Sequence, residues 1–276
     1  MKEIIKKLKN KYIIASGIAL IVVTVTLSII LLEDNKVITT STANVELSSK
    51  KIGWGIKRND NHEQPDLGKV NKQIIDEAKG IAMGNKESKK VYLTFDEGYE
   101  AGNTEKILET LKKNNVPAAF FITAHYVNTS PELVQKMIEG GHIIGNHTVN
   151  HKSMPSLSEE EIKKEVMNLH EVIYNKYGYE MKYIRPPKGE YSEKTVDYCN
   201  KLGYTTVMWS FAYDDWDENK QGREEYAKKK VLDNIHNGAV ILLHGNSKDN
   251  TNILDYCINE IKNMGYEFAT LDEFER

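Results

Sequence analysis

The pattern of apolar and polar positions becomes regular at Val91. From there to the C-terminus, short apolar runs typical of buried strands alternate with longer amphipathic stretches typical of helices. The strand-like runs are residues 91–95, 118–123, 142–146, 182–186, 205–211, 239–244 and 267–271. The clearest helical stretches are residues 103–114, 158–177, 192–203 and 252–265.

This alternation predicts the fold class. Near-continuous apolar strands separated by helices are typical of a parallel sheet that helices cover. We therefore expect an α/β fold, a distorted and incomplete (β/α)7-type barrel, with a doubly wound open sheet as the alternative. Helix boundaries support the division: Ser158 with Glu161 three residues later predicts a helix start. Gly178, Gly203 and Gly265 stand where helices need a left-handed residue to end.

The chain before Val91 has a different character. Residues 33–50 are rich in Ser, Thr and Asn without apolar periodicity, which predicts a flexible linker. Residues 51–87 mix turn signals with a short helical pattern and predict an N-terminal cap segment on a main domain that spans residues 88–276. The helical pattern rests on Val70, Ile74, Ile75 and Ala78.

Residues 13–32 are a run of twenty uncharged residues, long enough to cross a bilayer core of about 30 Å. The preceding tail, residues 1–12, is basic, which favours an N-terminus in the cytoplasm. We therefore expect a transmembrane anchor, with everything after residue 33 outside the cytoplasmic membrane. The alternative is a cleaved signal peptide, but the run is long and ends in Leu31 and Leu32 rather than in small residues.

Charge and cysteine content narrow the function. The first twelve residues contribute +4 to the net charge of −3, which leaves about −7 for the rest of the chain. An acidic exported part argues against nucleic acid as a partner. Cys199 and Cys257 fall on helices that another predicted helix separates, so we expect two buried free thiols. We also expect a monomer.

Two histidines follow one of the predicted strands. His147 and His151 are four residues apart, and one helical turn would put both imidazoles on the same side. Neutral imidazoles so placed can share a metal ion. Taken alone, such a pair is more often an accident of a polar loop.

Asp96 and Glu97 close another strand. Strand alternation sends neighbouring side chains to opposite faces unless the chain turns at once, and Gly98 permits such a turn. Acidic residues at strand ends are commonly solvated or cap a helix. With the histidines, however, one carboxylate would complete a site that suits Zn²⁺, and the other would serve as a base for an attacking water.

Three more strand ends carry polar residues: Arg185, the pair Asp215 and Trp216, and His244. Each has a plain structural reading as an ion pair, a packed loop or a structural histidine. Parallel strands, however, bring their carboxyl ends to one face, where barrel enzymes place their sites. On that face Arg185 would hold a catalytic Asp ionised, Asp215 and Trp216 would form a pocket wall, and His244 would be a general acid.

Five motifs at these positions resemble, in order, those of the polysaccharide deacetylases of carbohydrate esterase family 4. They are TFDEG (94–98), HTVNH (147–151), RPPKG (185–189), DDW (214–216) and LLH (242–244). The likeness runs from about Ile52 to the C-terminus. Within the family it resembles most the sporulation-type enzymes that remove the N-acetyl group from muramic acid in peptidoglycan and so contribute to muramic-δ-lactam in spore cortex.

The resemblance implies a role for each residue. It makes Asp96 the catalytic base, Arg185 the residue that orients this base, and His244 the general acid. It makes His147 and His151 ligands of a divalent metal, Zn²⁺ with Co²⁺ or Mn²⁺ as alternatives, and Glu97 stands at the position of a further ligand. The remaining pocket residues are Asp215, Trp216, Pro187 and Lys188. The implied partner is the glycan strand of peptidoglycan.

Departures from the wider family favour peptidoglycan over chitin. Glu97 stands where most members have a second Asp, Ala212 stands where an Asp normally follows the Trp, and Lys188 replaces an aromatic residue of chitin-type relatives. Three alternatives stay open: an N-acetylglucosamine deacetylase, an O-acetyl esterase and a catalytically impaired wall-binding protein.

Overall fold

The computed structural model describes residues 47–276, which form one compact unit. The predicted tail, anchor and most of the linker lie outside the described residues. Within residues 47–276, no helix combines the length and the apolar composition needed to span a bilayer.

A parallel sheet forms the centre of the described unit. Its order is β7-β5-β4-β3-β2-β8, and β9 also pairs with β2. The strands are β2 (Lys90–Glu97), β3 (Ala119–Ile122), β4 (Ile143–Asn146), β5 (Tyr183–Ile184), β7 (Thr205–Thr206), β8 (Val240–His244) and β9 (Glu267–Phe268). Each falls within one predicted strand or overlaps it by most of its length, which confirms the α/β class. A parallel bridge from Phe211 to Ile241 joins the chain after β7 to β8, so the sheet curves round into an irregular, incomplete barrel.

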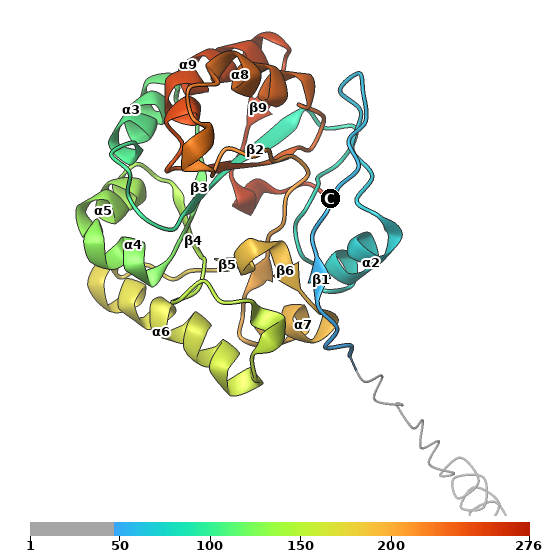
Figure 1. Cartoon of the computed structure of the whole chain (residues 1–276), viewed down its shortest axis with the longest axis vertical. Helices are drawn as coiled ribbons and strands as arrows, with labels where there is room; N and C mark the ends of the chain where they lie inside the picture. Colours follow the sequence, from blue (N-terminus) through green and yellow to red (C-terminus); the bar gives the residue numbers. More distant parts are fainter. Residues whose placement is uncertain (1–46) are drawn as a thin grey trace, which may run out of the picture. The chain divides into compact units, whose positions relative to one another are not determined.

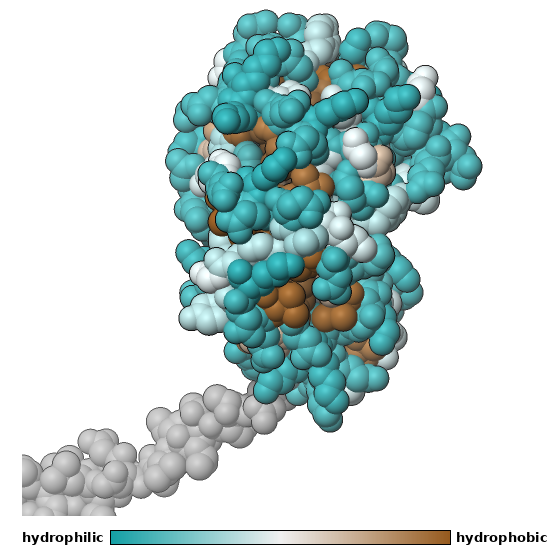
Figure 2. Space-filling model, turned by 90° about the vertical axis from the view of Figure 1, so that its left-hand side faces the viewer, coloured by the Kyte–Doolittle hydropathy of each residue, from teal (hydrophilic) through white to brown (hydrophobic). Residues whose placement is uncertain are grey.

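Helices surround the strands (Figure 1). They are α2 (Lys69–Glu77), α3 (Thr104–Asn114), α4 (Ala124–Thr129), α5 (Pro131–Glu139), α6 (Glu159–Tyr177), α7 (Glu193–Lys201), α8 (Glu224–Asp233) and α9 (Lys248–Asn263). Ser158 and Glu161 form the predicted capping box of α6, and Gly178 ends that helix in the left-handed conformation. The face that Figure 2 shows is mainly hydrophilic, and the hydrophobic residues on it appear in separate groups.

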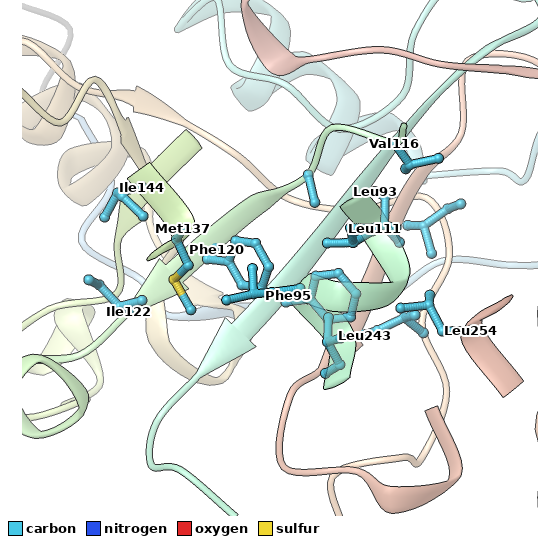
Figure 3. Close-up of a cluster of buried hydrophobic side chains, with 14 of the residues drawn as sticks. Leu93, Phe95, Leu111, Val116, Phe120, Ile122, Met137, Ile144, Leu243 and Leu254 are labelled. Carbon is cyan, nitrogen blue, oxygen red and sulfur yellow. The ribbon is translucent and has the colours of Figure 1, made fainter. Parts of the chain in front are cut away.

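Strand alternation divides the core into two layers. On β2, Leu93 and Phe95 point outward into the large cluster between sheet and helices, where Phe95 stacks on Phe120 with ring centroids 5.1 Å apart (Figure 3). Tyr92 points the other way, into a smaller cluster inside the barrel that also contains Phe121. The two positions that follow on β2, Asp96 and Glu97, continue this alternation.

The N-terminal segment packs against the main fold. Its two-residue strand β1 (Ile52–Gly53) pairs antiparallel with β6 (Glu190–Tyr191). The predicted helix is present as α2, with Ile74 and Ile75 buried. Both cysteines are buried free thiols, as expected.

Candidate active site

A pocket of about 1330 Å³ opens where the strands end. Its lining includes Asp96, His147, His151, Lys188, Trp216 and His244. These residues come from segments up to 148 positions apart, and the parallel sheet brings them together because each follows or ends a strand. Arg185 and Asp215 lie behind this lining and contact it directly.

Arg185 fixes the carboxylate of Asp96. The guanidinium is fully buried and donates hydrogen bonds to Asp96 Oδ1 at 2.7 Å and to Thr94 Oγ1 at 2.9 Å. The guanidinium carbon Cζ of Arg185 lies 4.1 Å from the centroid of the Phe121 ring. Burial by itself raises the pKa of Asp96, but the positive charge of Arg185 and the neighbouring His147 outweigh it and hold that pKa below its ordinary value. Asp96 is therefore an oriented, ionised carboxylate at neutral pH.

His147 and His151 meet through their Nε2 atoms, which are 3.1 Å apart. The predicted helical turn between them is wrong, because residues 147–151 are an irregular loop. Instead, Thr148 and His151 adopt positive φ angles of 68° and 52°. Such conformations are strained for residues with a side chain and cluster at functional sites.

Hydrogen bonds from outside the loop hold this conformation. Asn146 Oδ1 accepts from the backbone N–H of Thr148 at 2.8 Å. The buried carboxylate of Glu165 on α6 accepts from the backbone and the side chain of Asn150, at 2.7 and 2.8 Å. The loop therefore depends on α6 for its shape.

The histidine pair fits one divalent ion. The Nδ1–H of His147 donates to the carbonyl oxygen of Arg185 at 2.9 Å, which leaves its Nε2 lone pair directed at the pocket. Burial lowers the pKa of His147, and burial together with His147 lowers that of His151 to about 4, so both imidazoles are neutral. Two nitrogen ligands of one tetrahedral ion stand about 3.3 Å apart. The carboxylate next to them is Asp96, whose Oδ2 lies 3.5 Å from His147 Nε2.

The structure does not bring Glu97 to the histidines. Because β2 continues through Glu97, alternation turns this side chain away from the pocket and into the layer beneath the helices. There it is fully buried, 3.5 Å from Thr104 Oγ1 of α3, and its Oε2 has no hydrogen-bond partner among the described residues. Burial, followed by Glu100 and Asp96, raises its pKa well above the ordinary value. The predicted turn at Gly98 comes too late to redirect it.

Within residues 47–276, no three His, Cys, Asp or Glu side chains converge as a metal-binding group. The expected ligand set of two histidines and Glu97 is therefore reduced, in this arrangement, to the two histidines.

His244 and Asp215 form a second fixed pair. The Nδ1–H of His244 donates to Asp215 Oδ1 at 2.8 Å, and the backbone N–H of His244 donates to Oδ2 at 2.8 Å. Asn250 of α9 adds a donor to the same carboxylate at 2.6 Å. Burial lowers the pKa of His244, but the charge and hydrogen bond of Asp215 prevail and raise it. The imidazole thus presents Nε2 to the pocket as a proton donor.

The remaining predicted residues divide between the wall and its support. Trp216 lies at the rim with 58% of its surface exposed, and Lys188 lines the wall. Pro187 is buried and lies outside the lining. Sequence reasoning gave no role to Thr94, although it lies in the TFDEG motif and binds Arg185. It also missed Glu165 and Asn250, which contact Asn150 and Asp215 from α6 and α9 and belong to none of the five motifs.

Comparisons with known proteins agree with this geometry. Residues 83–207 match the family model described as polysaccharide deacetylase. The chain is 40% identical over 226 residues to the peptidoglycan-N-acetylmuramic acid deacetylase PdaA of Bacillus subtilis. The aligned residues make up 82% of this chain and 86% of that protein. The solved structure of that protein, a family 4 carbohydrate esterase, has a TM-score of 0.80 at 39% identity and covers 83% of this chain and 98% of its own.

Two further similar proteins are described with other functions. A peptidoglycan-N-acetylglucosamine deacetylase of Listeria monocytogenes is 32% identical over 188 residues, which are 68% of this chain and 39% of that protein. A solved structure from Bacillus anthracis, described as a family 4 pseudoenzyme, has a TM-score of 0.66 at 26% identity and covers 71% of this chain and 68% of its own.

Proposed function

Because the chain belongs to the polysaccharide deacetylase family, carbohydrate esterase family 4, and is a hydrolase of linear amide bonds, we propose that it removes the N-acetyl group from N-acetylmuramic acid in peptidoglycan. The observation that carries the chemistry is that one pocket holds Asp96, whose pKa is held below its ordinary value, and His244, whose pKa is raised. The similarity to the muramic acid deacetylase supports the choice of sugar.

His147 and His151 would hold a divalent ion, Zn²⁺ with Co²⁺ or Mn²⁺ as alternatives. When bound, such an ion supplies Lewis acidity toward the acetamide oxygen and lowers the pKa of a nearby water. The chain itself supplies the ligands as neutral imidazoles, and it fixes the His147 ring through the carbonyl of Arg185.

Asp96 takes a proton from the attacking water. Its Oδ1 is held by Arg185, which leaves Oδ2 directed toward the pocket. A carboxylate whose pKa is held low is a weak base in bulk water, but here it is fixed beside the point of attack and does not need to reorganise.

His244 gives a proton to the leaving sugar nitrogen. Asp215 keeps the imidazole in the tautomer with Nδ1–H and stabilises its protonated form. The free amine and acetate then leave, and His244 regains a proton from the pocket water or Asp96. A backbone N–H near Lys188, in the turn after Arg185, would stabilise negative charge on the reacting oxygen.

Acetate release tests this function. The purified full-length chain, supplied with Zn²⁺, Co²⁺ or Mn²⁺, should release acetate from peptidoglycan glycan strands. The variant Asp96→Asn should lose about 10²- to 10⁴-fold in rate, because it removes the base, while the metal content stays unchanged. Asp255→Asn, which neutralises an exposed carboxylate on α9, serves as the matched control. No acetate from the unaltered chain with any of the three metals would refute the proposal.

One observation favours a second candidate function. Glu97 does not join the histidines, and a family 4 pseudoenzyme of similar fold exists in Bacillus anthracis. A catalytically impaired protein that binds the cell wall would likewise lack a carboxylate beside the two histidines at the position of Glu97. Elemental analysis separates the two, because an enzyme should retain close to one divalent ion per chain through gel filtration, whereas the impaired protein should retain none.

We further propose that residues 13–32 anchor the chain, with the catalytic unit outside the membrane. Their twenty uncharged residues after a basic tail support this placement. Fractionation should then recover the intact chain with the membrane. A role in spore cortex predicts that deleting the gene removes muramic-δ-lactam from cortex muropeptides. Unchanged lactam would assign the enzyme to another part of the wall.

A further inference from the structure

Of the described residues that line the pocket, Lys188 is the one lysine or arginine. Within residues 47–276 it forms no ion pair, since Glu190, two positions along, is engaged by Lys51 at 3.0 Å. Three acidic residues of the pocket pair with other cations: Asp96 with Arg185, Asp214 with Arg223 at 3.3 Å and Asp217 with Lys220 at 3.3 Å. The fourth, Glu218, accepts a hydrogen bond from Tyr99. Lys188 therefore presents an uncompensated ammonium group.

The backbone presents this group from a fixed turn. Lys188 has φ 61° and Gly189 has φ 64°, both left-handed. The carbonyl of Gly189 accepts a hydrogen bond from the backbone N–H of Trp54 at 2.8 Å, and the ring of Trp209 lies so close that a Cβ on Gly189 would meet it at 2.7 Å. A left-handed position favours Gly or Asn, so the turn itself gives no reason for a lysine. A lysine at this position must therefore be explained by its side chain and not by the backbone conformation.

The proposed substrate has a matching anion. Muramic acid differs from glucosamine by a lactyl ether on the carbon next to the one that bears the acetamide, and the free lactyl group ends in a carboxylate. When the acetamide lies between Asp96 and the histidines, this carboxylate must lie in the same pocket. Among the described residues that line the pocket, Lys188 is the one lysine or arginine that can attract it.

We propose that Lys188 binds the lactyl carboxylate and thereby selects muramic acid over glucosamine. This inference rests on the proposed function. It makes Lys188 a specificity residue, with no part in the proton transfers of Asp96 and His244.

A pair of matched substrates tests the contact. One is an oligosaccharide of alternating N-acetylglucosamine and N-acetylmuramic acid with free lactyl carboxylates, and the other is the same oligosaccharide with these carboxylates converted to methyl amides. Lys188→Gln should raise KM for the first substrate by roughly five- to tenfold, with kcat retained, because it removes one ion pair. It should leave KM for the second unchanged. Lys188→Arg should stay within roughly twofold of the unaltered chain on both.

Lys182→Gln is the matched control, because Lys182 is an exposed lysine at the opposite end of β5 and outside the pocket lining. It should change neither KM. An equal change on both substrates in Lys188→Gln, or no change on either, would overturn the role of Lys188. Failure of the unaltered chain to release acetate from either substrate would instead overturn the proposed function.

Discussion

At the scale of single residues, the proton donor of the site depends on one buried carboxylate. Asp215 is 2% exposed and binds both the ring and the backbone of His244. A general acid must be protonated when the substrate binds, so a raised pKa of His244 extends activity toward higher pH. Without Asp215, the imidazole would lose the charge and the hydrogen bond that oppose burial most strongly, and its pKa would fall.

We therefore expect Asp215→Asn to move the alkaline limb of the kcat/KM profile to lower pH. The variant should lose more activity at pH 8 than at pH 6, measured as acetate release in buffers of equal ionic strength. Asp249→Asn is a suitable control. Asp249 is also buried, at the start of α9, but its carboxylate accepts hydrogen bonds from the backbone of residues 222 and 223 instead of from His244. An alkaline limb that stays in place in Asp215→Asn would show that another group supplies the proton.

The sequence predicted these residues unevenly, for a physical reason. Asp96, His147, His151, Arg185, Asp215 and His244 each follow an apolar run, and parallel strands bring such ends together. Glu97 follows the same run, but its face depends on whether β2 continues for one more residue, which the sequence does not determine. Glu165 and Asn250 act through contacts 15 and 35 residues away in the chain, so no local pattern reveals them.

At the scale of elements, the side chain of Glu97, which the site does not use, packs at the end of β2 against the residue that follows β8. A Cβ on Gly245, directly after His244, would lie 1.9 Å from Oε1 of Glu97. The carboxyl group of Glu97 thus occupies the space beside the backbone that carries the proton donor. Its raised pKa favours the uncharged form of the carboxyl group in this packing.

This packing predicts a compensating pair of substitutions. Gly245→Ala should lower the free energy of unfolding by about 1–3 kcal/mol, because the added methyl group overlaps the buried carboxyl group. Glu97→Ala should remove that overlap, so the double variant should be more stable than the sum of the two single effects by about 0.5–3 kcal/mol. Urea unfolding of the four proteins measures this difference. Additive effects would mean that the two residues do not touch.

The sequence predicted helices and strands correctly where a continuous apolar run or a clear helix-start signal was present. The capping box of α6 and all seven strands of the parallel sheet were recognisable, since each carries a continuous apolar run or a paired start signal. The helices that were missed are α4, α5 and α8. The first two have six and nine residues, too few for an amphipathic period to stand out. In α8 only Ala227 and Val231 are buried, so its apolar stripe is faint.

At the scale of the whole described unit, the N-terminal cap segment supports the pocket from behind. Trp54 donates a hydrogen bond from Nε1 to the carbonyl of Trp209 at 2.9 Å and packs in a cluster with Tyr191. Ile81 forms a parallel bridge to Val207, beside β7. The segment thus holds both the turn that carries Lys188 and the chain that continues toward Asp215. The sequence indicated a cap but gave no sign of this role, because both partners lie more than a hundred residues away.

Two truncations separate this support from the predicted anchor. A chain of residues 47–276 should keep the free energy of unfolding and the acetate release of the full-length protein, because these residues form one compact unit. A chain that begins at residue 68 loses β1 and Trp54, which leaves the apolar faces of Tyr191 and Trp209 in water and frees the turn at Gly189. It should therefore unfold at lower urea concentration and show a raised KM. Equal stability of the two truncated chains would show that residues 47–67 do not brace the pocket.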